Sequence, residues 1–185
     1  MNALTFSTKA RNLERLMGRL TSASILPLYY FPKSLWEKDP QKCLVNIHQN
    51  IKPIGNFIVR SSAKTEDNNI RSNAGAFLSV PNVQSFNLHQ AINDVFSSYK
   101  SDDASDEVLI QPMLNDVVMS GVAFSHDAQT CGPYRTVNWS EGLSTSDVTS
   151  GNSNTHLWYH TAASGKVKNK EILPTKQYYI NHKLP

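Results

Sequence analysis

The sequence predicts an α+β fold, because helical and strand patterns occupy different parts of the chain. Apolar residues recur at steps of four, three and four between Leu88 and Tyr99, which predicts a helix over residues 87–99. Two apolar runs, at 108–113 and 117–124, instead have the length and composition of strands. We therefore expect mixed or antiparallel sheets with flanking helices.

A polar, charged stretch at 101–106 separates the helix from the two apolar runs. It predicts a boundary between an N-terminal lobe over residues 1–106 and a β-rich second lobe over residues 107–185. Asn115-Asp116 lies between the two runs and is a good turn sequence. The simplest arrangement of these runs is thus a hairpin or two adjacent strands of one sheet.

The N-terminal lobe is predicted to contain further short elements. Residues 10–20 place apolar side chains at helical spacing and arginines on the other side, which is typical of a surface helix with Lys9 near its start. An extended apolar segment follows at 25–31, and a short helical turn at 34–37 comes after it. Another helix is predicted at 40–49.

The second lobe has two more strand candidates, at 134–139 and 156–159. The segment between them, 141–154, is dense in Ser, Thr and Gly. Such a composition fits a flexible connector and equally a loop that a ligand orders.

Composition excludes several classes of function. The formal charge of +3 over 185 residues is small and evenly scattered, so no nucleic-acid partner is expected. Residues 1–10 lack the features of a secretory signal and no apolar stretch approaches membrane-spanning length, so we expect a cytoplasmic protein without membrane association. Cys43 and Cys131 lie far apart without a CxxC motif, which argues against a disulfide framework or a zinc site.

The segment 58–67 has the residue types of a phosphate-binding site. A β-branched pair leads into Arg60, whose planar fork of donors suits an anion, and two serines and a lysine follow it. Ala74 and Gly75 form a small-residue turn at which main-chain N–H groups could approach a ligand. By composition alone, an ordinary loop surface remains the more frequent alternative.

Five motifs occur in order along most of the chain. They are STKARNL at 7–13, VRSSAKTED at 59–67, NAGAF with VPNV at 73–83, VLIQPM at 108–113 and SGVAFS at 120–125. Together they resemble the N-terminal nucleotide-binding domain shared by phosphoenolpyruvate synthase and pyruvate phosphate dikinase, a two-lobed ATP-grasp fold. EGL at 141–143 is a weaker echo of a further motif of that domain.

The resemblance implies that ATP binds between the lobes and assigns roles at its phosphate end. Lys9 would reach the polyphosphate as a mobile point charge, and Arg60 would hold the phosphoryl group in transfer; both count as candidate catalytic residues. The Ala74 and Gly75 turn would cover the phosphates. A solvated lysine at a helix start, and an arginine paired with the acidic residues at 66–67, are the structural alternatives.

At the nucleoside end, the resemblance places Gln111 and Met113 beside the adenine and Gly142 at the far wall of its pocket. Gln111 and Met113 also alternate on a predicted strand, so simple core and surface positions stay open for them.

The chain departs from the family pattern in three places. Ser7-Thr8 replaces a glycine pair, Thr145 stands where the family has an acidic residue, and residues 152–185 lack the segment that supplies magnesium ligands. We therefore expect a C-terminally incomplete domain whose Mg²⁺ ligands lie outside this chain.

The family implies an ATP-dependent phosphotransferase that passes phosphate from ATP to a histidine carrier domain and then to pyruvate or another small molecule. The carrier and acceptor-binding domains would belong to a longer polypeptide, and this chain alone is expected to be inactive. The alternative is a degenerate, non-catalytic ATP-grasp module with a structural or interaction role.

Overall fold

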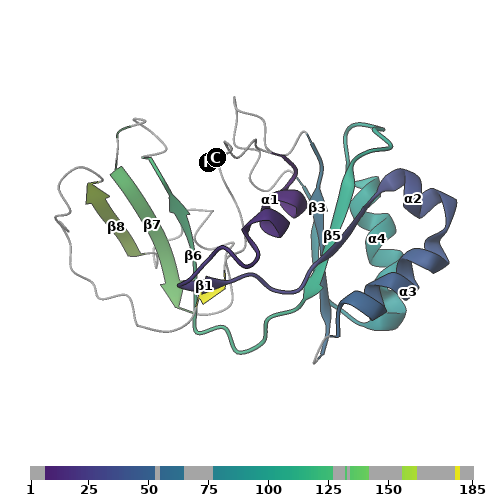
Figure 1. The fold of residues 1–185 in the computed structure, drawn as a ribbon, viewed down its shortest axis with the longest axis horizontal. Coiled ribbons are helices and arrows are strands. Elements are labelled where there is room, and N and C mark those ends of the chain that lie inside the picture. The colour runs from purple at the N-terminus through teal and green to yellow at the C-terminus, as the bar shows by residue number, and fades with distance from the viewer. Residues whose placement is uncertain are drawn as a thin grey trace. The chain divides into compact units, whose positions relative to one another are not determined.

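The structure, a computed structural model, describes residues 7–52, 55–64, 77–126, 132, 134–141, 156–161 and 178–179. The chain forms two compact units (Figure 1): Met1–Met113 with Gln177–His182, and Leu114–Lys176 with Lys183–Pro185. The first unit combines helices with an antiparallel sheet, so the predicted α+β class is confirmed. Its main segment continues past the predicted boundary at residue 106, because the strand that follows belongs to its sheet.

The first unit is built on a four-stranded antiparallel sheet of order β2-β5-β3-β4. The strands are β2 (Tyr29–Pro32), β3 (Phe57–Ser62), β4 (Ser79–Val83) and β5 (Glu107–Pro112). A short parallel pair, β1 (Ala23–Ser24) with β9 (Tyr178–Tyr179), stands apart from it.

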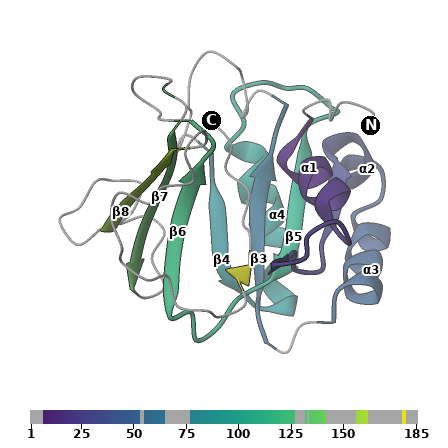
Figure 2. The same ribbon diagram turned by 60° about the vertical axis from the view of Figure 1, so that its left-hand side comes forward.

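Helices lie on both faces of this sheet. The helix α1 (Lys9–Leu16) lies on one face, and α2 (Lys33–Lys38), α3 (Pro40–Asn50) and α4 (Leu88–Ser97) lie on the other, as Figures 1 and 2 show. A 3₁₀ turn, η1 (Ser85–Asn87), leads into α4. The helices predicted at 10–20, 34–37, 40–49 and 87–99 are thus confirmed with small shifts at their ends.

Local signals explain where two of these helices start and stop. Asp39 caps α3 by accepting a hydrogen bond from the Lys42 N–H at 2.9 Å, and Pro40 occupies the first helical position, where its missing N–H costs nothing. The helix α1 ends at Leu16, before the predicted limit at residue 20. Gly18 adopts φ +73°, a conformation outside the helix that glycine tolerates.

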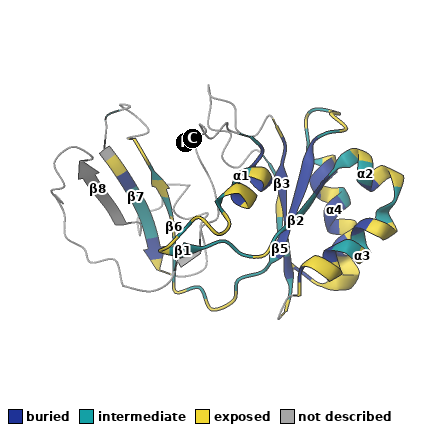
Figure 3. Cartoon of the chain, in the orientation of Figure 1, coloured by how far each residue is buried: buried dark blue, intermediate teal, exposed yellow. Residues whose placement is uncertain are grey.

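The larger core lies between the sheet and the three helices. Phe57 and Val59 of β3, and Val108 and Ile110 of β5, face this side, and each is fully buried. They pack against Trp36, Cys43, Ile47, Leu88, Ile92 and Val95. A smaller cluster on the opposite face joins Ala10 and Leu13 of α1 to Leu109 of β5. Figure 3 shows β3 and β5 buried along most of their length.

The predicted pairing of the runs at 108–113 and 117–124 is wrong. The first run forms β5, which lies between β2 and β3, whereas the second forms β6 (Met119–Phe124), which pairs with β7 (Tyr134–Glu141) in a separate sheet. The reason is burial. Residues Glu107 to Gln111 of β5 are all buried, as in a strand covered on both faces, and a hairpin at the edge of a sheet would not bury them.

The second unit contains an antiparallel meander of three strands, β6, β7 (Tyr134–Glu141) and β8 (His156–Thr161). The prediction of strands in this part of the chain is confirmed. Gly121 of β6 pairs with Trp139, and a Cβ atom at Gly121 would lie 2.5 Å from the main-chain oxygen of Asn138. The glycine therefore allows the two strands to approach each other.

We predict that Gly121→Ala destabilises the second unit by about 1–3 kcal/mol, because backbone of β7 must move to admit the methyl group. Chemical denaturation measures this free energy of unfolding. Ser120→Ala is the matched control on the same strand: its buried Oγ has no hydrogen-bond partner among the described residues, so its removal should leave stability unchanged or raised. Equal stability of Gly121→Ala and the wild type would contradict the close approach.

Tyr30 gives the first unit a dependence on alkaline pH. Its hydroxyl donates to Oε2 of Glu14 on α1 at 2.7 Å, and burial, helped by this hydrogen bond and the negative charge, raises the pKa of Tyr30 to about 12. The neutral phenol is thus favoured in the folded state. Its contribution to stability is complete below the usual pKa of about 10 and is lost as the pH rises to about 12.

We therefore expect the difference in unfolding free energy between the wild type and Tyr30→Phe to shrink between about pH 10 and about pH 12. Urea unfolding at successive pH values measures this difference. In a Glu14→Gln background the decline should be smaller and should end at lower pH, since the carboxylate no longer opposes ionisation. A difference that stays constant across the interval would refute the assignment.

Candidate functional site

Three of the predicted site residues share the α1 side of the first unit. Lys9 begins α1, while Arg60 and Gln111 lie on β3 and β5. Met113 follows the end of β5, where its N–H donates to the carbonyl of Asn56 at 2.8 Å. Ala74, Gly75 and Gly142 lie outside the described residues, so their predicted roles stay predictions.

Arg60 is buried on the sheet, with 8% of its surface exposed. Its strand neighbours Val59 and Ser61 alternate with it, and Val59 packs into the helical core. Because side chains alternate across a strand, Arg60 belongs to the α1 face. In register it stands between Leu109 of β5 and Ser79 of β4.

Lys9 is also buried, with 3% exposed. Its Nζ donates to the main-chain oxygen of Ser61 at 3.1 Å, and Ser61 directly follows Arg60. Lys9 is therefore not a solvated lysine at a helix start. The ammonium group reaches the strand that carries the guanidinium, although the two residues lie 51 positions apart in the sequence.

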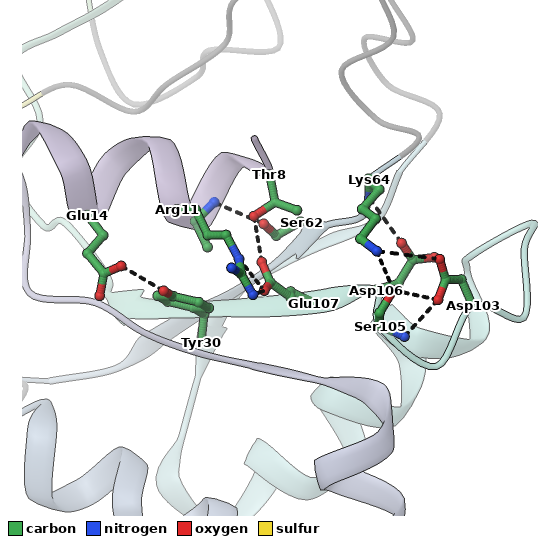
Figure 4. Close-up of polar contacts among 11 residues, drawn as sticks. Thr8, Arg11, Glu14, Tyr30, Ser62, Lys64, Asp103, Ser105, Asp106 and Glu107 are labelled. Carbon is green, nitrogen blue, oxygen red and sulfur yellow. Dashed lines mark hydrogen bonds and ion pairs between the residues drawn. The ribbon is translucent and has the colours of Figure 1, made fainter. Parts of the chain in front are cut away.

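Two neighbouring strands hold the first turn of α1 in place. Ser62 of β3 and Glu107 of β5 are cross-strand partners. The hydroxyl of Thr8 donates to Oε2 of Glu107 at 2.5 Å, and the N–H of Ala10 donates to Oγ of Ser62 at 2.9 Å. Figure 4 shows Thr8, Ser62 and Arg11 around the Glu107 carboxylate.

Arg11 supplies the charge that the buried carboxylate needs. Its Nε and Nη2 lie 2.8 and 2.7 Å from Oε1 of Glu107. The side chain of Glu107 is 2% exposed and that of Arg11 is 52% exposed, so the pair lies at the border between protein and solvent. The hydrogen bond and the negative charge raise the pKa of Arg11. A buried carboxylate with both oxygens bonded avoids most of the free-energy cost of burying a charge.

The amide of Gln111 is the most unusual polar group on this face. It is 1% exposed, and neither its Oε1 nor its Nε2 has a hydrogen-bond partner among the described residues. It stands opposite Ile58 on β3. Most buried side-chain amides in proteins are hydrogen-bonded, so a donor and an acceptor left open together suit a ligand that offers both.

The end of β3 is tied to the loop before β5. Asp106 accepts from the Lys64 N–H at 3.0 Å and from the Ser101 hydroxyl at 2.8 Å, while Nζ of Lys64 donates to the hydroxyl of Ser105 at 2.7 Å. The contacts of Lys64 with Asp106 and Ser105 appear on the right of Figure 4. The segment that follows, with Glu66 and Asp67, lies outside the described residues, so a clamp between it and Arg60 stays a prediction.

Sequence reasoning missed Thr8, Ser62, Asp106 and Glu107 as organisers of this site. A buried acidic residue at the start of an apolar strand was the available signal, since Glu107 directly precedes the VLI run. The sequence pattern does not identify Thr8 as the hydrogen-bond partner of Glu107, because the two residues lie 99 positions apart.

Within the described residues, no group of three or more His, Cys, Asp or Glu side chains is arranged to hold a metal ion. Among the same residues, no helix combines the length and the hydropathy that a membrane span requires.

A comparison with family models matches residues 31–183 to the family described as pyruvate phosphate dikinase, AMP/ATP-binding domain. The match covers well over half of the chain and includes Arg60, Gln111 and Met113, whereas Lys9 precedes it. A comparison with curated proteins gave no match. Four of the five sequence motifs lie within the matched range, and this chain belongs to the pyruvate phosphate dikinase AMP/ATP-binding domain family.

Proposed function

We propose that this chain is the ATP-binding portion of an enzyme of the phosphoenolpyruvate synthase type, with the ATP-grasp architecture of that family. One observation carries the proposal: Lys9 and Arg60 are both buried, and the ammonium of Lys9 bonds to the residue next to Arg60. Both side chains therefore belong to one face of the sheet, and their positive charges suit the negative charge of a polyphosphate.

The two cations suit different parts of a phosphoryl transfer. Arg60 offers a planar, permanently charged fork that can hold two oxygens of the phosphoryl group in transfer. Lys9 offers a compact charge that neutralises the oxygens of a neighbouring phosphate. Such groups accelerate transfer by positioning and by stabilising charge in the transition state, so neither has to donate or accept a proton.

The nucleoside end of the ligand is proposed to meet Gln111 and Met113. An adenine edge presents a donor and acceptors side by side, which the open amide of Gln111 can pair with. Met113 follows the end of the same strand and offers a polarizable side chain for the face of the base. We propose that Ala74 and Gly75 approach the phosphates, and the role expected for Gly142 stays a prediction.

The further steps of the proposal concern the longer protein. Mg²⁺ would neutralise part of the phosphate charge, and no cluster among the described residues is assigned to hold it. A histidine carrier would take the phosphate from ATP and deliver it to pyruvate or another small acceptor. We propose a cytoplasmic setting, where ATP is supplied.

Arg60→Met and Lys9→Met are expected to weaken ATP binding at least about tenfold each, because each removes a charge-assisted contact worth about 1.5–3 kcal/mol. Isothermal titration calorimetry with ATP measures this loss, and adenosine should show a much smaller one. Arg19→Met removes an exposed cation just beyond α1 and should bind ATP like the wild type. Wild-type ATP affinity in folded Arg60→Met would favour the non-catalytic module instead.

Gln111→Leu separates a binding role from a structural one. The substitution removes a buried amide that has no partner among the described residues, so the free energy of unfolding should stay the same or rise. Affinity for both ATP and adenosine should fall, since the contact is to the base. A variant that keeps full affinity for adenosine would remove Gln111 from the nucleoside site.

A further inference from the structure

We propose that the cross-strand pair Ser62 and Glu107 positions Lys9 for the nucleotide, by holding the residues on either side of it. The inference rests on the proposed function for the part that concerns ATP. Ser62 and Glu107 are positioning residues here, since they act through the helix that carries Lys9.

The first turn of α1 is capped from the sheet. The opening N–H groups of a helix have no partner within it, and the side chain of the N-cap residue usually accepts from one of them. Thr8 occupies the N-cap position but makes no such bond among the described residues. Its hydroxyl donates to Glu107 instead, and Ser62 accepts the Ala10 N–H that a threonine cap could have taken.

This exchange of partners ties the helix start to two strands at once. Lys9 lies between Thr8 and Ala10, so its main chain is held on both sides by side chains that are partners across β3 and β5. The same two strands carry Arg60 and Gln111. These hydrogen bonds therefore fix the base of the Lys9 side chain relative to Arg60 and Gln111, the residues of β3 and β5 that are assigned to the nucleotide.

The orientation of Glu107 is itself determined by Arg11. The guanidinium takes Oε1 of the carboxylate and leaves Oε2 for Thr8. A lysine side chain loses rotamer entropy when it is ordered. Lys9 is already buried and bonded to Ser61, so part of this entropy is lost during folding. That part does not reduce the free energy of ligand binding.

The test uses Thr8, where a matched pair of substitutions is available. Thr8→Val keeps the shape and removes the hydroxyl, whereas Thr8→Ser keeps the hydroxyl. We expect Thr8→Val to weaken ATP binding about two- to tenfold, the range for one hydrogen bond, and Thr8→Ser to restore it. In a Lys9→Met background, Thr8→Val should have no further effect, because its action passes through Lys9.

A second readout does not depend on ATP. Acylation of Lys9 by an amine-selective reagent, followed by mass spectrometry, should be slow in the wild type, faster in Thr8→Val and slow again in Thr8→Ser. The exposed Lys38 serves as the internal reference, and the thermal midpoint shows that each variant is folded. If Thr8→Val does not fold, Ser62→Ala with Ser62→Thr forms an equivalent pair.

Two outcomes overturn the inference. One is an unchanged acylation rate of Lys9 in folded Thr8→Val; the other is an equal loss of ATP affinity from Thr8→Val with and without Lys9. The proposed function of Lys9 fails separately, through wild-type ATP affinity in Lys9→Met, and the acylation rates still decide whether the sheet positions the lysine.

Discussion

The bond between the Glu107 carboxylate and the first turn of α1 is the interaction on which the candidate site depends. At eight residues, α1 is too short to be stable alone in water, so contacts with the sheet must hold it. Apolar packing of Ala10 and Leu13 against Leu109 supplies attraction without direction. The hydrogen bonds to Glu107 and Ser62 are directional, so they determine how the helix start is oriented and where Lys9 lies.

The central strand β5 combines two tasks by alternation of its side chains. Val108 and Ile110 pack into the larger core, while Glu107, Leu109 and Gln111 belong to the α1 face. Polar groups of the site are thus anchored in a strand that is buried on both faces. Such an element keeps side chains in place better than a loop does, which suits a site that works by positioning charge.

Local patterns predicted those elements whose signals lie within a few residues. The helices predicted at 87–99 and 40–49 are examples. The sequence pattern did not predict the strand β4, because Pro81 and Asn82 are residue types typical of turns. In the structure Asn82 adopts a positive φ of 57° within this strand. A proline is tolerated there because β4 lies at the edge of the sheet. The expected pairing of the runs at 108–113 and 117–124 was wrong because a turn sequence does not specify which strands pair.

The sequence alone determined the residue types of an anion site, the order of the family motifs and the choice of Lys9, Arg60 and Gln111 as candidates. Tertiary structure decided that Thr8 bonds to Glu107 across 99 positions and Ala10 to Ser62 across 52. Periodicity and capping rules compare near neighbours only. Contacts between distant residues depend on how the strands pair, and folding alone places a helix start against a particular strand.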